Sequence, residues 1–331
     1  MHLSVILCTY NRSDLLAVAL ESVAASQMDS SWDWEVLVVD NNSKDRTREV
    51  AAQFVSRFPG RFRYLFEPAQ GKSNALNTGI RESRGDILAF IDDDVVAEPT
   101  WLQNLTAPLR DPAWAGVGGR IAPPRDFTPP RWLALEGPYE LGGILALFDK
   151  GPDGTELTEA PFGTNMAYRR HLFEKYGLFR PDLGPCPGTE IRGEDTEFGR
   201  RVLKGGDRLW YEPSAVVHHA VPENRLRKSY FLRFLYDHGR AAIRAKPQGQ
   251  PLFFIPRLYF TLPKIVLASL LPRTLAWLVS IDPQRRFQRK CMVWMNIGQV
   301  AEIRTSLSGS HKSVSSATQH TPVMNGKHNL P

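Results

Sequence analysis

In about its first hundred residues, the chain alternates short apolar runs with amphipathic stretches whose apolar residues recur at helical spacing. Continuous apolar runs of roughly four to eight residues are typical of strands that are buried on both faces. Regular alternation of such strands with helices predicts a mostly parallel sheet flanked by helices, an α/β fold. We expect strands at 4–8, 35–40, 62–66 and 86–91, and helices at 13–25, 45–58 and 72–83.

Polar residues follow three of these predicted strands at the point where each strand ends. They occupy positions 9–12, 40–43 and 92–94. In open parallel sheets, ligands bind at the carboxyl ends of the strands. We therefore expect a binding site at this edge of the sheet.

The run Asp92, Asp93 and Asp94 directly follows the apolar residues 87–91. Carboxylates at this spacing repel one another unless a cation compensates them. A divalent metal with oxygen ligands, carrying a phosphorylated substrate, provides such compensation. The alternative is an acidic loop that caps the next helix, although surface acids rarely follow five continuous apolar residues.

Length and composition are those of a globular protein with one large or two ordinary domains. The chain has 331 residues, of which 42% are hydrophobic and 23% charged. Its three cysteines form no Cys-x-x-Cys pair, which favours a reducing compartment without disulfides or a cysteine-based zinc site. The first predicted strand starts too early to leave room for a secretory signal. These features predict a cytoplasmic protein.

Charge is divided unevenly along the chain. Residues 223–331 carry 17 Lys and Arg against 4 Asp and Glu, a net charge of +13, while residues 1–222 carry a net charge of −7. A basic excess confined to one segment indicates an anionic partner such as nucleic acid or an anionic membrane surface.

The middle of the chain has weaker patterns. Residues 122–162 are rich in Pro, Gly and aromatics, which predicts long loops. Gly116 to Gly119 lack the spacing of a dinucleotide-binding loop, and Phe66 stands where a phosphate-binding loop ending at Lys72 would need glycine. Further along we expect a strand at 163–168, a helix at 194–203, short strands at 208–211 and 215–219, and a basic amphipathic helix at 228–245.

Residues 252–281 are strongly apolar, but Arg257, Lys264 and Arg273 interrupt them. No uncharged run exceeds eight residues, whereas a spanning helix needs ~20 apolar residues. Two interpretations stay open: a helix or helical hairpin in the membrane interface, or a helical subdomain packed on the core. We expect a sheet domain at 1–222, a helical extension at 223–304 and a disordered Ser-, Thr-, His- and Asn-rich tail at 305–331.

Five segments, taken in order, resemble the family 2 inverting glycosyltransferases of the GT-A fold. Their order and separations together are specific, although no single segment decides. The resemblance covers roughly residues 3–222. The segments are SVILCTYNR (4–12), VVDNNS (38–43) with Asp45 and Thr47, GKSNALN (71–77), DILAFIDDD (86–94) and GEDTEF (193–198).

The resemblance implies a Rossmann-like GT-A domain that passes a sugar from a nucleoside diphosphate sugar to a hydroxyl acceptor. It implies a divalent cofactor, Mn²⁺ or Mg²⁺, which would neutralise the departing diphosphate. By resemblance, Asp94 and Asp92 are metal ligands, and His219 contacts the metal or the diphosphate. Two adjacent histidines on a strand point to opposite faces, so at most one of His218 and His219 is a ligand.

The resemblance also assigns the other site residues. Asp195 is the general base that takes the acceptor's proton, and Glu194 faces the acceptor or a structural arginine. The alternative for this pair is acids enriched in the first turn of a helix, and the alternative for Asp40 is an N-cap. The nucleotide-sugar residues are Thr9, Asn11, Arg12, Asp40, Asn42, Lys72, Asn74, Asn77, Asp92 and Asp93, and Gly163, Thr164 and Asn165 line the acceptor side.

We expect a metal-dependent inverting glycosyltransferase of cell-envelope polysaccharide or glycolipid synthesis, peripheral on the inner face of the cell membrane. The acceptor would be lipid-linked, the basic segment would meet an anionic membrane surface, and no nucleic acid would bind. A sugar nucleotidyltransferase of similar fold is a first alternative, disfavoured because positions 9–12 lack a Gly-rich loop. A catalytically silent membrane- or nucleic-acid-binding module is a second, disfavoured by the acids at 92–94 and 195.

Overall fold

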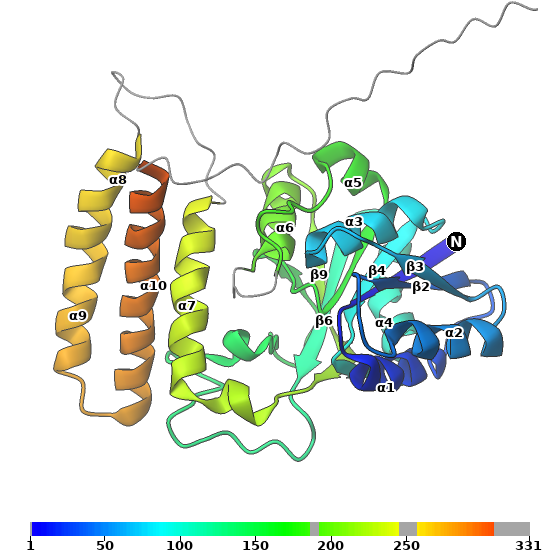
Figure 1. The fold of residues 1–331 in the computed structure, drawn as a ribbon, viewed down its shortest axis with the longest axis horizontal. Coiled ribbons are helices and arrows are strands. Elements are labelled where there is room, and N and C mark those ends of the chain that lie inside the picture. Colours follow the sequence, from blue (N-terminus) through cyan, green and yellow to red (C-terminus); the bar gives the residue numbers. More distant parts are fainter. Residues whose placement is uncertain (1, 186–191, 245–256, 308–331) are drawn as a thin grey trace, which may run out of the picture.

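The computed structural model describes residues 2–185, 192–244 and 257–307. Within these ranges, nine strands form one mixed sheet in the order β3-β2-β1-β4-β8-β6-β9-β5, with β7 paired to β9. Figure 1 shows helices on both sides of the sheet and the last helices standing beside it as a separate layer. The predicted α/β sheet with a helical C-terminal extension is confirmed.

The first half of the sheet is parallel and follows the predicted alternation of strands and helices. β1 pairs with both β2 and β4, and β2 pairs with β3, all in parallel. The carboxyl ends of β1, β2 and β4 therefore meet at one edge. The elements are β1 (His2–Thr9), α1 (Ser13–Ala24), β2 (Asp33–Asp40), α2 (Thr47–Arg57), β3 (Phe62–Phe66), α3 (Lys72–Glu82) and β4 (Ile87–Asp92).

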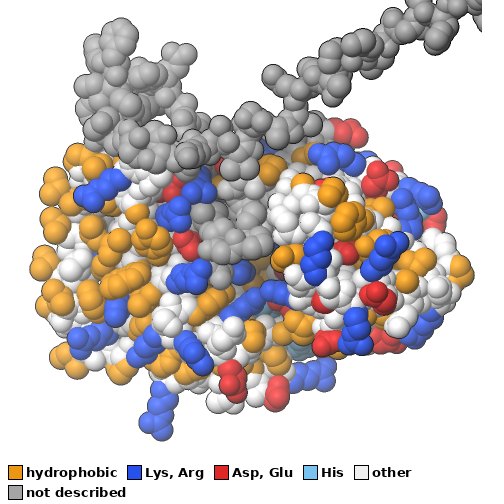
Figure 2. All heavy atoms as spheres, viewed as in Figure 1, with side chains coloured by type: hydrophobic (Ala, Val, Ile, Leu, Met, Phe, Trp, Pro, Cys, Tyr) orange, Lys and Arg blue, Asp and Glu red, His pale blue; other side chains and the backbone are white. Residues whose placement is uncertain are grey.

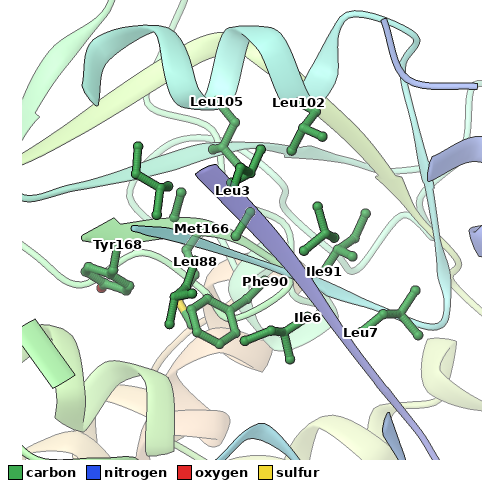
Figure 3. Packing of buried hydrophobic residues seen from close by; sticks show 14 of the residues in the cluster. Leu3, Ile6, Leu7, Leu88, Phe90, Ile91, Leu102, Leu105, Met166 and Tyr168 are labelled. Carbon is green, nitrogen blue, oxygen red and sulfur yellow. The ribbon is translucent and has the colours of Figure 1, made fainter. Parts of the chain in front are cut away.

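The strands at the centre of the sheet are mostly apolar because helices cover both of their faces. In β1, Leu3, Ile6 and Leu7 are fully buried, and full burial of such a side chain contributes roughly 1.5–3 kcal/mol. Figure 3 shows Leu102 and Leu105 of α4 (Trp101–Thr106) packing over this layer. The core thus holds rigid the strand ends that carry the polar residues.

The second half of the sheet is partly antiparallel and differs from the prediction. β8 (Asn165–Arg169) pairs antiparallel with β4 and β6. β6 (Gly116–Ala122) was not expected as a strand, because its glycines leave no alternating pattern. Those glycines allow close approach: a Cβ on Gly119 would lie 2.3 Å from Asn165 Nδ2. The remaining strands are β5 (Val95–Ala97), β7 (Thr155–Leu157) and β9 (Leu209–His219).

Two further predictions are corrected in this half. The two short strands expected at 208–211 and 215–219 are one strand, β9, whose pairing with β6 shifts register after Gly119. Pro213 interrupts the apolar pattern there, and a bulge tolerates proline within a strand. The region 122–162, expected as loops, contains β7 and the short 3₁₀ helix η2 (Gly142–Leu145). Short helices complete this half: η1 (Ala107–Arg110), α5 (His171–Tyr176), α6 (Glu194–Lys204) and η3 (Glu223–Leu226).

The C-terminal layer consists of helices that pack on one another and on the loops beside the sheet. α10 lies between α7 and α9, as Figure 1 shows. A Cβ on Gly239 of α7 would lie 2.0 Å from Met295 O of α10, so these two backbones touch through glycine. The elements are α7 (Lys228–Arg244), α8 (Arg257–Ile265), the π-helical turn η4 (Val266–Leu270), α9 (Leu271–Leu278) and α10 (Pro283–Leu307).

The apolar segment predicted at 252–281 is helical from Arg257 onward, and residues 252–256 lie outside the described residues. α9 packs on α10 of the same layer, while Leu271, Leu275 and Leu278 of α9 stay exposed, so the structure is compatible with both interpretations. Among the helices described, none combines the length and hydropathy that a bilayer crossing requires. α10 continues to Leu307, past the expected start of the tail, and residues 308–331 are not among those described.

Candidate active site

A cavity of about 650 Å³ opens at the carboxyl ends of β1 and β4 and reaches the C-terminal layer. Ten of the predicted site residues line it, and they come from the ends of six different elements or the loops beside them. The sheet thus gathers side chains that are far apart in sequence. The ten residues are Thr9, Arg12, Lys72, Asp92, Asp93, Asp94, Thr164, Glu194, Asp195 and His219.

The first of the three acids, Asp92, is the last residue of β4 and is held by two side chains. Lys72, the first residue of α3, forms an ion pair with Asp92 Oδ1. Thr164 Oγ1 donates a hydrogen bond of 2.8 Å to Asp92 Oδ2. Burial acts most strongly and raises the pKa of Asp92, but the charge of Lys72 together with the hydrogen bonds from Lys72 and Thr164 outweighs it, so the pKa lies below its usual value. Asp92 is therefore ionised and oriented.

The next two acids share one guanidinium. Arg12 Nη1 donates to Asp93 Oδ1 at 3.0 Å and to Asp94 Oδ2 at 2.9 Å, and Thr9 Oγ1 donates to Asp93 Oδ2 at 2.7 Å. The repulsion expected among the three acids is thus compensated in part by cations of the chain itself. Arg225 adds a third positive side chain, 3.6 Å from Asp94 Oδ2.

Asp93 and Asp94 differ in acidity. Burial raises the pKa of Asp93 to about 6, because Arg12 lowers it by less than burial raises it. Burial acts on Asp94 in the same direction, but the hydrogen bond and charge of His219, followed by the charge of Arg12, hold its pKa well below the usual value. At neutral pH all three acids are ionised, with Asp93 the most easily protonated.

The donor set beside Asp94 fits a divalent cation in part. Asp94 Oδ1 lies 3.4 Å from His219 Nε2, and the buried His219 Nδ1 has no hydrogen-bond partner in the part of the chain that is described. Carboxylate oxygen, imidazole nitrogen and substrate phosphate are suitable ligands for Mn²⁺ or Mg²⁺. Asp92 does not join this donor set, because its carboxylate pairs with Lys72. Among residues 2–185, 192–244 and 257–307, no three acidic, His or Cys side chains form a metal-binding group, so the predicted trio is not assembled.

Asp195 lies in the first turn of α6, with its carboxylate oriented by two backbone groups. Gly163 N donates to Asp195 Oδ2 at 2.7 Å, and Thr196 N donates to Asp195 Oδ1 at 2.6 Å. Lone pairs on both oxygens remain available to a hydroxyl in the cavity. This is the geometry that a general base requires.

The neighbouring acid, Glu194, is buried and lies in a different environment. Its Oε2 accepts a hydrogen bond of 3.1 Å from Gly193 N. Burial, followed by the negative charge of Asp195, raises the pKa of Glu194 to about 7, although Lys72 acts in the opposite direction. At neutral pH, Glu194 is therefore about half protonated.

Three of the remaining predicted residues belong to the strand ends and loops after β1 and β2. Asn11, after β1, is exposed and Asn42, after β2, is half-buried, and they have positive φ angles of 51° and 65°. Asp40 is buried and accepts hydrogen bonds of 2.8 Å from Ser43 N and from the hydroxyl of Tyr64. Asp40 thus closes the loop rather than capping α2. None of these three side chains is among the lining of the cavity in the described structure.

The other four predicted residues also lie outside the cavity lining that the structure describes. Asn74 donates to Gln70 O at 3.0 Å. Asn77 forms two hydrogen bonds with the backbone of Phe179, and the fully buried Asn165 bonds Trp101 Nε1 and two backbone carbonyls. Gly163 acts through its N–H on Asp195. Asn77 and Asn165 therefore hold segments together.

Several residues of the cavity were not predicted from the sequence. Asn41, beside Asp40, accepts a hydrogen bond of 2.8 Å from Gly71 N and so positions the start of α3. Its place in the same motif was a signal that could have identified it. Arg225, Phe234 and His238 carried no such signal, because the packing of η3 and α7 brings them to the site.

Comparison with known proteins identifies the family. Residues 4–177 match Glycosyl transferase family 2. The chain belongs to this family. It is a glycosyltransferase, as predicted, and the alternative of a silent binding module is set aside.

Similar proteins come from different organisms. The family 2 chain is 30% identical over 229 residues to glycosyltransferase AglE of Haloferax volcanii, covering 69% of the chain and 70% of that protein. It is 30% identical over 241 residues to the succinoglycan biosynthesis protein ExoM of Rhizobium meliloti, covering 72% and 74%.

A solved structure shares the fold. The mannosyltransferase PcManGT from Pyrobaculum calidifontis, in complex with GDP-Man and Mn²⁺, superposes with a TM-score of 0.60 at 21% identity, covering 91% of the family 2 chain and 86% of the other. The predicted GT-A fold is confirmed by this likeness.

Proposed function

We propose that this family 2 glycosyltransferase is metal-dependent and inverting, and transfers a sugar from a nucleoside diphosphate sugar to a hydroxyl acceptor. The observation that carries the proposal is the placement of Asp195, with two oriented oxygens, in the same cavity as the three acids after β4. The complex of PcManGT with GDP-Man and Mn²⁺ supports the donor and metal classes. The name of ExoM supports a role in cell-envelope polysaccharide or glycolipid synthesis.

The donor would bind at the strand ends, where Arg12 and Lys72 supply positive charge for the diphosphate. Asp94 and His219 would hold the metal, with Asp92 and Asp93 beside it. When bound, Mn²⁺ or Mg²⁺ neutralises the charge that develops on the departing nucleoside diphosphate.

Asp195 would complete the reaction on the acceptor. The acceptor oxygen forms a bond to the anomeric carbon while the bond from that carbon to the diphosphate breaks. The hydroxyl proton passes to Asp195, whose carboxylate is held by Gly163 N and Thr196 N. A single displacement of this kind inverts the anomeric configuration.

A panel of sugar nucleotides tests the proposal by thermal shift with and without Mn²⁺, followed by donor hydrolysis and by NMR of the transfer product. We expect one donor to raise the melting temperature only with metal present, and the product to have the opposite anomeric configuration. Retained configuration, or stabilisation by none of the donors, would refute the proposal. Release of pyrophosphate from a nucleoside triphosphate and a sugar 1-phosphate would support the nucleotidyltransferase alternative instead.

We also propose that the C-terminal layer binds an anionic membrane surface, which would bring the enzyme to a lipid-linked acceptor. Leu267, Leu271, Leu275 and Leu278 recur at helical spacing and are each at least 50% exposed. The surface over this layer, at the left of Figure 2, shows hydrophobic side chains interspersed with Lys and Arg. Apolar area together with basic charge is what an interfacial helix offers to anionic lipids.

Sedimentation with vesicles tests this location. We expect binding to vesicles that contain anionic lipids, weaker binding at high salt, and strong loss of binding when Leu271 and Leu275 are both replaced by Gln. Val18→Gln, at an exposed position of α1, is the matched control. Lack of vesicle binding at low salt, or a dimer that the double variant dissociates, would contradict the proposal.

A further inference from the structure

We infer that the end of the cavity formed by the C-terminal layer is an acceptor subsite for hydrocarbon, so that the acceptor carries an apolar group close to its reacting hydroxyl. The inference rests on the proposed function and specifies its acceptor class. Its basis is the division of the cavity wall between two sets of elements. The sheet contributes charged residues, and η2, α7 and α10 contribute most of the apolar ones.

The apolar wall consists of six side chains that offer no strong hydrogen-bonding group. They are Leu141, Ile144, Phe162, Phe234, Leu235 and Met292. A sugar ring pressed against the aliphatic members would lose water from its hydroxyls without gaining partners, which is unfavourable. Hydrocarbon placed there gains free energy in proportion to the area removed from water. The wall therefore selects hydrocarbon rather than a second sugar.

This wall begins beside the proposed base. Phe162 precedes Gly163, whose N–H binds Asp195 Oδ2 at 2.7 Å. On the other side, the guanidinium of Arg192 lies over the ring of Phe234, 5.7 Å from its centre, and Arg192 is two residues before Glu194. When an acceptor hydroxyl reaches Asp195, the acceptor atoms bonded next to that hydroxyl would thus contact Phe162 and Phe234.

The wall is preformed by a hydrophobic core of its own. Leu141, Ile144 and Leu235 belong to a buried cluster that also contains Phe231 and Phe287. Trp132 packs edge-on against both of these rings, with centroids 5.1 Å and 4.8 Å apart. Because the wall is already packed in the described structure, little conformational freedom is lost when hydrocarbon binds.

Polar groups accompany the wall where the head of an acceptor would lie. Glu140 and His238 also line this part of the cavity. The ring of His238 stacks on that of Phe234 at an interplanar angle of 7°. These side chains can bind hydroxyls beside the reacting one, while the aliphatic residues contact the hydrocarbon. The subsite thus fits an alkyl or prenyl glycoside, or a lipid-linked sugar.

Pairs of acceptors that differ only in their aglycone test the inference. Methyl and octyl glycosides of the same sugar would be compared with the active donor, below the micelle concentration of the octyl compound. We expect the octyl compound to have a KM at least tenfold lower, since each fully buried methylene group contributes about fourfold. Met292→Gln and Ile144→Thr are each expected to reduce this preference severalfold.

Ile297→Gln is the matched control, because Ile297 lies on the same helix as Met292 but is 38% exposed. It should retain the full preference for the octyl glycoside. Equal KM values for the methyl and octyl compounds, with donor turnover intact, would overturn the inference and leave the proposed function standing. An unchanged preference for the octyl glycoside in both Met292→Gln and Ile144→Thr would also overturn the inference. Failure of every sugar nucleotide to turn over would instead refute the proposed function.

Discussion

Replacement of Asp195 by Asn removes the proposed base while keeping the shape of the side chain. The two carboxylate oxygens of Asp195 each accept a backbone hydrogen bond, from Gly163 N at 2.7 Å and Thr196 N at 2.6 Å. Asparagine has one carbonyl oxygen, so one of these N–H groups would face an amide group that is itself a donor. The lost hydrogen bond should lower the free energy of unfolding by about 1–3 kcal/mol.

The effect on catalysis should be larger than the effect on stability. Loss of general base catalysis reduces kcat by roughly 10²–10⁴-fold, which is about 3–5 kcal/mol of transition-state stabilisation. Donor binding should change little, because the diphosphate would contact Arg12 and Lys72 while Asp94 and His219 would hold the metal, and Asp195→Asn leaves all of these in place. The substitution thus separates catalysis from binding.

The assay compares kcat for transfer with the donor dissociation constant, measured by calorimetry in the presence of Mn²⁺. Glu197→Gln is the matched control, because Glu197 lies on the same helix but pairs with Arg201 at 3.0 Å outside the cavity. A single i,i+4 ion pair contributes only about 0.5 kcal/mol to folding stability. We therefore expect the control to stay folded and to retain wild-type kcat within about twofold. A fall in kcat of less than tenfold in Asp195→Asn, or donor binding weakened in proportion to the rate, would refute the assignment.

Three further predictions follow from the same contacts. The pKa of Glu194 is raised to about 7 in the folded protein, so between pH 4.5 and 7 the folded chain keeps a proton that the unfolded chain has lost. This residue therefore makes the free energy of unfolding fall as pH rises from about 4.5 to 7. In Glu194→Gln, the melting temperature should fall less over this range, and an unchanged dependence of melting temperature on pH would contradict the raised pKa. His219→Ala should raise the Mn²⁺ concentration needed for half-maximal donor hydrolysis at least tenfold. His218→Ala should not, because the ring of His218 bonds Pro123 O and Glu98 away from the cavity. Equal effects of the two substitutions would refute the metal role of His219. Glu302→Ala removes the fully buried carboxylate that Arg240 and Arg244 share and should lower the free energy of unfolding by about 3 kcal/mol. A loss below 1 kcal/mol in urea denaturation would show that these two ion pairs are dispensable.

Local sequence pattern was sufficient for the parallel half of the sheet. Each strand there is a continuous apolar run followed by polar residues, and each helix has its own spacing, so no long-range contact is needed to recognise them. The glycine-rich β6 was missed because its glycines leave room for the side chains of Asn165 and Tyr168 on the neighbouring strand, a reason that is visible only in the sheet. The break in β9 was predicted wrongly because Pro213 marks a bulge rather than an end.

The candidate site divides in the same way. Thr9, Arg12 and the acids at 92–94 follow strand ends, and topology alone places them together. Asn77 and Asn165 were predicted as ligand contacts from their residue type and their motifs. Their side-chain amides instead form hydrogen bonds with backbone groups and hold separate segments of the chain together. An asparagine pattern does not distinguish a ligand contact from a structural one, because both need the same donor and acceptor.

The sequence by itself therefore determined the parallel sheet, its polar edge and the glycosyltransferase family, since these depend on patterns within each segment and on the order of segments. Only the tertiary structure decided which cations compensate the acids, which histidine faces Asp94, and that η2, α7 and α10 form an apolar wall beside Asp195. These features depend on the packing of segments far apart in the chain, and no local pattern records which side chains such packing brings into contact.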